Sequence, residues 1–214
     1  MPKRFVDLTL TVRHGMRGVA IEPHTRIDPD GYNTTNLHLY SHSGTHMDAP
    51  LHFLDGGSTI DQWPLAQLIG PAHVIDLSSI EPNGLHTVAD LLPHADKVTP
   101  GCRLLLRSDW SLHAELPDYR PDMPRISADL ARWLVARQVA LVGVETPSVA
   151  SLRPENKAEL TEVHHTMLGG KIVIVECLTA LRELRQETVE FIALPLKIDG
   201  GDGSPVRAIA IEEE

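Results

Sequence analysis

Three histidines and one aspartate lie within eleven residues of this chain, at 42–52, where the sequence reads HSGTHMDAPLH. Neutral imidazoles and a carboxylate are ligands that zinc and manganese take in proteins. The glycine and the proline within the stretch disfavour a helix, and the residues before it alternate polar with apolar. We therefore predict an extended chain, in which alternate side chains point to one side. That side carries His42, His46, Asp48 and His52.

This same-side set predicts a site for a divalent metal. The alternative is three unrelated histidines, each on the surface or satisfied in a polar core, because short motifs also occur by chance. The spacing His-x3-His-x-Asp-x3-His favours the metal, and the glycine within it leaves room for close approach to the backbone.

A second group of metal-binding residue types occurs at 163–176, where the sequence reads VHHTMLGGKIVIVE. His164 and His165 fall in a loop or at a helix end, and Glu176 ends a strongly apolar strand. A carboxylate there either reaches solvent or is paired or bound to a metal, because burying a lone charge is costly. Combined with the first group, Asp48 and Glu176 could bridge two cations, an arrangement that activates a water and polarises a carbonyl.

Stretches rich in Val, Ile and Leu predict the strands that position these groups. They are residues 5–12, 36–43, 72–78, 103–108, 139–145, 171–176, 189–196 and 206–211. Helices are predicted at 127–137 with Ser127 as N-cap, at 88–95 with Thr87 as cap, and at 178–185. Residues 13–35 are rich in Gly, Pro, Asp, Asn and Thr and predict a long functional loop.

The order of these elements predicts the fold class. Several strands lie next to helices in the sequence, and no linker divides the chain. We therefore expect a single α/β domain with a mixed sheet over residues 1–214.

Composition narrows the class of protein. The net charge of −10 and the absence of a basic stripe argue against nucleic acid as a partner. No apolar run approaches the length of a membrane span, and the N-terminus alternates instead of forming a signal peptide, so we predict a cytoplasmic protein without a membrane partner. Cys102 and Cys177 follow no disulfide or zinc pattern, and we expect buried, reduced thiols.

Other catalytic motifs are missing from the sequence. Without GxSxG, a serine α/β-hydrolase is disfavoured. Without GxGxxG after a strand or GxxxxGK[ST], nucleotide cofactors have no support. The glycine-rich GGDGSP at 200–205 lacks phosphate-loop spacing and predicts a turn.

The stretch HSGTHMDAPLH resembles the signature of the cyclase family of metal-dependent hydrolases, whose members include bacterial kynurenine formamidase and isatin hydrolase. Further stretches are similar to family blocks and occur in family order. These are PLAQLIGPAHVIDLS, LLLRSDWS, LVGVETPSV, HHTMLGGKIVIVE and LPLKIDGGDGSPVRAIA. The resemblance implies a swivelling β/β/α fold and a homodimer or higher homo-oligomer, with the N-terminal loop of one subunit near its neighbour's site.

The resemblance also implies a role for each residue of the site. His42, His46 and Asp48 bind one metal, and His52 is the general acid/base. His164 and Glu176 complete the site, with Asp48 and Glu176 bridging in a binuclear zinc form. One or two Zn2+ per chain are expected, with Mn2+ as the alternative. His165 is not expected to be a ligand.

Two departures from the family pattern bear on the substrate. Kynurenine formamidases place a tryptophan in the N-terminal substrate region, whereas this chain offers Phe5, Tyr32 and Tyr40 there. Glu145 stands where relatives often have aspartate.

Three hypotheses follow for the function. The first is a metal-dependent amidohydrolase that cleaves an amide C–N bond, most simply in a small aryl formamide such as N-formylkynurenine. The second is a ring-opening hydrolase of a cyclic amide or lactone. The third is a non-catalytic metal-binding protein.

Overall fold

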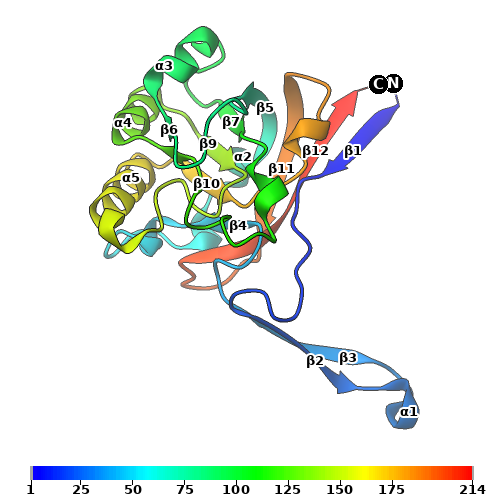
Figure 1. The fold of residues 1–214 in the computed structure, drawn as a ribbon. Helices are drawn as coiled ribbons and strands as arrows, with labels where there is room; N and C mark the ends of the chain where they lie inside the picture. The colour runs from blue at the N-terminus through cyan, green and yellow to red at the C-terminus, as the bar shows by residue number, and fades with distance from the viewer. Residues whose placement is uncertain (1, 214) are drawn as a thin grey trace.

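Eight strands form the main sheet of the computed structural model, which describes residues 2–213. They are β1 (Lys3–Asp7), β4 (His46–Asp48), β5 (Ile69–Asp76), β7 (Arg103–Arg107), β9 (Leu141–Val144), β10 (Val173–Glu176), β11 (Thr188–Pro195) and β12 (Gly203–Glu213). Their order is β1-β12-β11-β5-β7-β9-β10-β4, and β4 pairs again with the start of β12. Seven strands thus close into a barrel-like ring, and β1 lies beside the far end of β12 (Figure 1).

The ring is a mixed sheet, as the sequence predicts. The pairs β5–β7, β7–β9 and β9–β10 are parallel, and the remaining pairs of the main sheet are antiparallel. Parallel neighbours need crossover segments, and these supply the helices on the outside of the ring.

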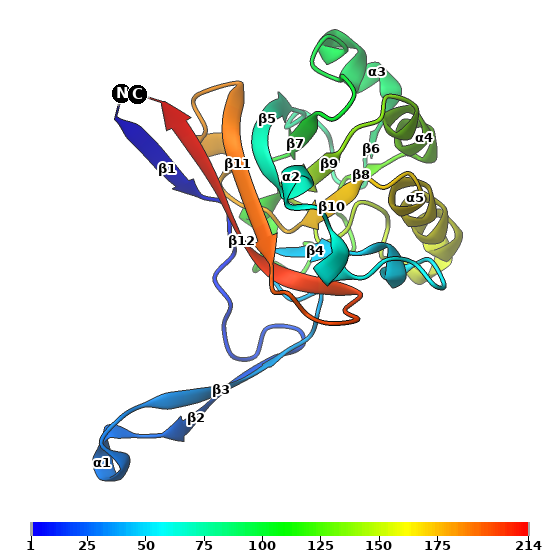
Figure 2. The ribbon, with the colours of Figure 1, turned by 180° about the vertical axis from the view of Figure 1, so that it is seen from behind.

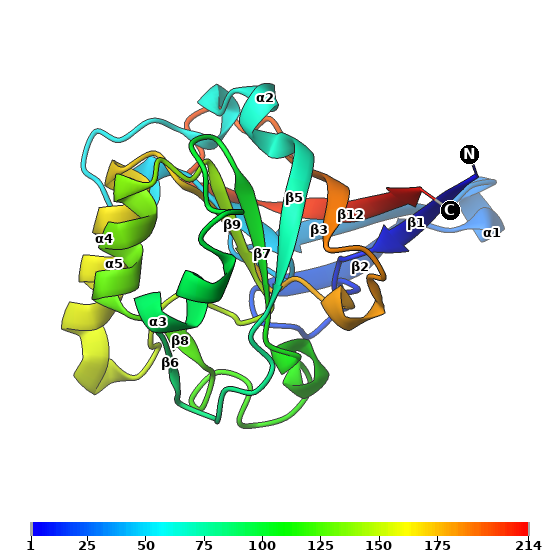
Figure 3. The same ribbon diagram turned by 90° about the horizontal axis from the view of Figure 1, so that it is seen from above.

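Helices α3 (Val88–Leu91), α4 (Ala128–Ala136) and α5 (Lys157–Gly169) cover the outer face of the parallel strands (Figure 3). The short α2 (Leu65–Leu68) precedes β5, and a small sheet joins β6 (Leu85–His86) to β8 (Arg125–Ile126). Ser127 accepts a hydrogen bond from the backbone N–H of Leu130, so the predicted N-cap is confirmed. Among residues 2–213, no helix has both the length and the apolar character needed to cross a membrane.

The parallel strands separate two apolar layers. In β7, Leu104 and Leu106 pack toward the helices, whereas Leu105 joins Phe191 of β11 inside the ring. Successive side chains of a strand point to opposite faces, so a strand buried on both faces needs apolar residues at every position. This explains why the sequence shows continuous apolar runs here.

A β-hairpin projects from the body of the molecule, and we call residues 19–39 the arm (Figures 1 and 2). It consists of β2 (Val19–Thr25), α1 (Ile27–Asp30) and β3 (Thr34–Leu39). All six residues of β3 are exposed. The prediction of an irregular loop at 13–35 is therefore wrong for most of its length, because cross-strand hydrogen bonds order this polar segment without burying it.

Two helix predictions also differ from the structure. The segment 178–185 forms only a 3-10 turn at Leu181–Glu183, because the N–H groups of Leu178 and Thr179 donate to the carbonyls of Val144 and Leu8. Helix α5, in contrast, occupies a region for which no complete helix was predicted. Its apolar residues are buried against the sheet, and this packing outweighs its weak local signal.

Candidate metal centre

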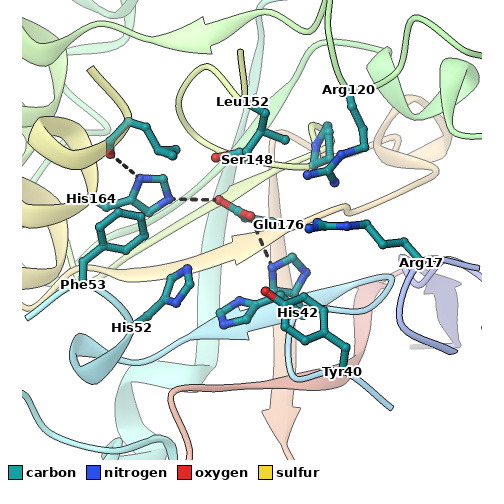
Figure 4. A pocket seen from close by; sticks show the side chains of 13 residues that line it. Arg17, Tyr40, His42, His52, Phe53, Arg120, Ser148, Leu152, His164 and Glu176 are labelled. Carbon is teal, nitrogen blue, oxygen red and sulfur yellow. Dashed lines mark hydrogen bonds and ion pairs between the residues drawn. The ribbon is translucent and has the colours of Figure 1, made fainter. Parts of the chain in front are cut away.

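Five short segments bring the predicted site residues together, and Figure 4 labels His42, His52, His164 and Glu176 among them. His42 lies in the turn before β4, and His46 and Asp48 are the two ends of β4. His52 ends the 3-10 turn Pro50–His52. Beyond this stretch, His164 comes from α5 and Glu176 from the end of β10. The structure thus gathers all six residues, whereas His165 is exposed and does not line the pocket beside them.

Strand register sets the central contact of the cluster. Strands β4 and β10 are antiparallel, with His46 directly opposite Glu176. Glu176 is buried, so the alternative that it reaches solvent is wrong. The predicted extended chain over 42–52 is confirmed only for His46–Asp48, because a left-handed Gly44 bends the chain before β4 and the 3-10 turn bends it afterwards.

Two buried carboxylates face two buried imidazoles at the centre. His46 Nε2 lies 3.3 Å from Glu176 Oε2 and 3.7 Å from Asp48 Oδ1. His164 Nε2 lies 3.6 Å from Glu176 Oε1 and 3.9 Å from Asp48 Oδ2. Ligand atoms of one metal ion lie about 3–4 Å apart when each is roughly 2 Å from the ion. The distances therefore fit a shared cation.

The outer nitrogens of these two rings orient them toward the carboxylates. His46 Nδ1 donates to the carbonyl of Gly44 at 2.8 Å, and His164 Nδ1 donates to the carbonyl of Leu160 at 2.7 Å. In a neutral imidazole the other nitrogen, Nε2, is then an acceptor. Acceptor nitrogens that point at carboxylate oxygens repel them unless a proton or a cation lies between. This arrangement, with a backbone acceptor behind the ring, is typical of metal-binding histidines.

The electrostatics of the cluster follow from the same contacts. Burial lowers the pKa of His164, but the hydrogen bond and charge of Glu176 outweigh it, and the net pKa is raised. Burial raises the pKa of Glu176, but His164 and His46 outweigh it and hold that pKa well below its usual range. Asp48 Oδ2 is buried and has no hydrogen-bond partner among residues 2–213. An orphaned carboxylate oxygen beside acceptor nitrogens fits a bound cation.

A second group shares Asp48 with the first. His42 Nδ1 lies 3.0 Å from Asp48 Oδ1, and the rings of His42 and His52 lie 3.9 Å apart between centroids. Asp202 adds a carboxylate on the other side, with Oδ2 at 3.1 Å from His42 Nε2. His42, Asp48 and His52 can offer ligand atoms to one ion, and His46, Asp48 and Glu176 can offer them to another.

Asp202 is a site residue that sequence reasoning missed. It lies in the GGDGSP stretch, for which the sequence predicts only a turn. The structure places this turn directly before β12, which pairs with β4 at Gly203–Pro205. An aspartate in a glycine-rich turn gives no local signal of a site, because only this pairing brings it to the histidines.

A pocket opens onto the cluster, lined by the four histidines and Glu176, and we call it the histidine pocket. Phe53, Leu152 and Leu160 supply apolar walls, and the Phe53 ring stacks on His164 at 4.2 Å. Of the three N-terminal aromatic residues offered by the sequence, only Tyr40 lines this pocket.

The other two aromatic residues lie elsewhere. Phe5 of β1 and Tyr32 of the arm are exposed. Tyr40 directly follows the arm, and its ring lies beside that of His42, at 5.4 Å between centroids (Figure 4).

Glu145 has a structural role outside the histidine cluster. Its buried carboxylate accepts hydrogen bonds from the N–H groups of Ser108 and Asp109 and from the hydroxyl of Ser111. It therefore holds the loop that follows β7, and it does not enter the histidine cluster.

A closed mixed sheet with a buried His/Asp/Glu cluster between its strands and α5 defines an α/β protein with a candidate site for a divalent metal. The sequence model of the Cyclase family matches residues 6–151. A kynurenine formamidase of Bacillus cereus is 34% identical over 177 residues, which cover 83% of this chain and 79% of that protein. The chain belongs to the Cyclase family.

Solved structures agree with this assignment. Isatin hydrolase A from Ralstonia solanacearum superposes with a TM-score of 0.84 at 27% identity, covering 99% of this chain and 92% of that one. A protein described as a potential metal-dependent hydrolase with cyclase activity superposes with a TM-score of 0.81 at 25% identity, covering both chains fully (100%). The expected cyclase-like fold is confirmed.

Proposed function

We propose that this chain is a metal-dependent amidohydrolase that cleaves the C–N bond of an aryl formamide such as N-formylkynurenine. The observation that carries the proposal is the pair of acceptor nitrogens, on His46 and His164, that face the buried carboxylates of Asp48 and Glu176. The similarity to a kynurenine formamidase supports the substrate class. The apolar wall around Phe53 suits an aromatic ring.

The proposed ligand set draws on both groups of the cluster and leaves out His52. His42, His46 and Asp48 would hold one ion, and His164 and Glu176 would complete the site, with Asp48 and Glu176 available to both ions of a binuclear form. We propose Zn2+, with Mn2+ as the alternative, because both accept imidazole and carboxylate ligands. When bound, the ion supplies an activated water and polarises the carbonyl of the amide.

His52 is the proposed general acid/base. Burial lowers its pKa, despite the opposing charge of Asp48, so the neutral ring prevails at pH 7 and can accept a proton. Asp202 Oδ2 lies 3.6 Å from His52 Nδ1, which favours a proton on Nδ1. Nε2 is then free to take a proton and to deliver it to the leaving nitrogen.

The proposal is tested on protein purified without a histidine tag. Metal per chain is measured by mass spectrometry, and hydrolysis of N-formylkynurenine and formanilide is assayed before and after chelation. We expect about one or two metal ions per chain and hydrolysis that chelation abolishes and zinc or manganese restores. A protein that binds no metal after reconstitution contradicts the site, and activity that survives complete chelation contradicts the mechanism.

A second candidate substrate is a cyclic amide or lactone, which the same site would open by the same attack. The observation that favours it is the similarity to Isatin hydrolase A over nearly the whole chain. A panel with isatin and simple lactones beside the two formamides separates the candidates by kcat/KM. Metal without turnover on any member of the panel would favour the non-catalytic alternative.

We also propose that the chain forms a homodimer or higher homo-oligomer through the arm. An isolated two-stranded ribbon is marginally stable in water. Here Ile27 and Leu37 are 66% and 59% exposed, so apolar side chains of the arm lack cover in the single chain. Sedimentation of the full chain and of a variant with residues 20–38 replaced by a short Gly-Ser linker tests this. A monomeric full chain would contradict it.

A further inference from the structure

Two arginines from distant segments line the histidine pocket. Arg17 precedes the arm, and Arg120 lies between the 3-10 turn Trp110–His113 and β8. Figure 4 shows both guanidinium groups directed into the pocket, on the side opposite His52 and Phe53. The pocket therefore has a cationic side facing its apolar wall.

Neither guanidinium forms an ion pair with a carboxylate in the part of the chain that the structure describes. Within residues 2–213, seven other arginines form ion pairs with carboxylates, and Arg17 and Arg120 form none. The seven are Arg4, Arg13, Arg107, Arg125, Arg132, Arg153 and Arg207. Arg17 lies over the ring of Tyr40, with its Cζ at 5.6 Å from the ring centroid. Burial and then the charge of Arg17 lower the pKa of Arg120, and together they outweigh the opposing charge of Glu176.

The backbone next to Arg120 is firmly held. Tyr119 is buried, its hydroxyl donates to the carbonyl of Glu145 at 3.0 Å, and its own carbonyl accepts from Trp110 Nε1 at 2.8 Å. Glu145 in turn fixes the start of the same loop through Ser108. These contacts fix the backbone that carries Arg120 before any ligand arrives, so only the side chain has to be ordered on binding.

We propose that Arg17 and Arg120 bind a carboxylate on the substrate and so select anionic aryl amides over neutral ones. Two like charges held together without a partner repel each other, and an anion between them removes that repulsion. Guanidinium groups suit a carboxylate because each offers parallel N–H donors. The inference rests on the proposed function only for the identity of the reacting bond.

Turnover tests the selectivity directly. Formanilide is compared with 2-, 3- and 4-formamidobenzoate, which add a carboxylate at three ring positions. We expect the best formamidobenzoate to exceed formanilide in kcat/KM by about tenfold or more, mainly through KM. Arg17→Gln and Arg120→Gln should each reduce that ratio several-fold, through a larger loss on the formamidobenzoate than on formanilide. Equal rates for the neutral and anionic substrates, or equal losses on both, overturn the inference.

Arg13→Gln is the matched control. Arg13 is a nearby exposed arginine that pairs with Glu115 and does not line the pocket. Its replacement removes the same charge from the same region, so it should leave the ratio unchanged. A ratio that falls as much in this variant would assign the effect to overall charge and overturn the inference.

Calorimetry separates a failure of this inference from a failure of the proposed function. Benzoate and benzamide are titrated into the metal-loaded protein, which needs no turnover. We expect the Kd of benzoate to be at least about tenfold lower than that of benzamide. The ratio of the two Kd values should be smaller in Arg17→Gln and in Arg120→Gln. It should be unchanged in Arg13→Gln. If no formamide is hydrolysed but this pattern holds, the proposed function fails and the inference stands. If both arginine variants keep the full preference for benzoate, the metal binds the carboxylate, and the inference about Arg17 and Arg120 is overturned.

Discussion

The carboxylate of Asp202 lies 3.6 Å from Nδ1 of His52, and the same oxygen, Oδ2, lies 3.1 Å from Nε2 of His42. One half-exposed aspartate therefore contacts both the proposed acid/base and a proposed metal ligand. Carboxylates behind histidines fix the tautomer and the orientation of the ring. Asp202 is in this sense a positioning residue.

Asp202→Asn should lower kcat by about 10- to 100-fold, because an amide cannot stabilise the protonated ring as a carboxylate does. Metal content should be nearly unchanged, since the proposed ligands themselves are all retained. The control is Asp199→Asn, an exposed aspartate of the same loop. Steady-state kinetics and metal analysis check the prediction, and equal kcat in the two variants would contradict it.

His52→Ala should lower turnover by about 100-fold or more while leaving metal bound, because the proposed role of His52 is proton transfer and not ligation. His165→Ala is the matched control, since His165 belongs to the predicted second cluster but is exposed outside it. Metal analysis and single-turnover rates are the measurements. A His52→Ala enzyme with near-normal kcat would remove His52 from the mechanism.

After metal removal, the stability of the protein should decrease as the pH rises. Burial lowers the pKa values of His46 and His164 in the metal-free chain, but their hydrogen bonds and the charge of Glu176 outweigh it, and both values are raised. A histidine whose pKa is higher in the folded than in the unfolded state stabilises the fold fully at pH values below its unfolded-state pKa, near 6.5. This contribution is lost as the pH rises through the folded-state pKa. The Tm of the chelated protein should therefore fall as the pH rises above about 6.5.

Metal binding has the opposite dependence, because its ligands must lose their protons. The increase in Tm on adding zinc should thus grow over the same pH range. Scanning calorimetry at several pH values with and without metal measures both effects. An increase in Tm that is the same at every pH would show that these imidazoles are not linked to the ion.

His86 predicts a second pH effect, away from the site. It is 4% exposed, its Nδ1 has no partner among residues 2–213, and burial lowers its pKa from 6.5 to about 4. The unfolded chain binds the proton more readily, so stability is lost as the pH falls from about 6.5 toward 4, by up to about 3 kcal/mol. The free energy of unfolding is measured with urea at several pH values for the wild type and for His86→Gln. It should depend less on pH in the variant. His14→Gln, at an exposed histidine, should follow the wild type.

Much of the fold was predictable from the sequence, because its signals are local. Continuous Val, Ile and Leu runs mark β7, β9 and β10, whose two faces are both buried. Ser127 marks the start of α4 through one hydrogen bond to Leu130. The segment 178–185 has helical residue types but forms only the 3-10 turn at Leu181–Glu183, since the N–H groups of Leu178 and Thr179 donate to Val144 and Leu8, which are distant in the sequence.

The sequence by itself determined the residue types of the site and their spacing in two short stretches. Only the tertiary structure decided that Glu176 lies opposite His46, that both carboxylates are buried, and that Asp202 and Arg120 reach the same site. The physical reason is that periodicity and capping act between neighbours in the chain, whereas strand register and burial arise from packing between segments that are distant in the sequence.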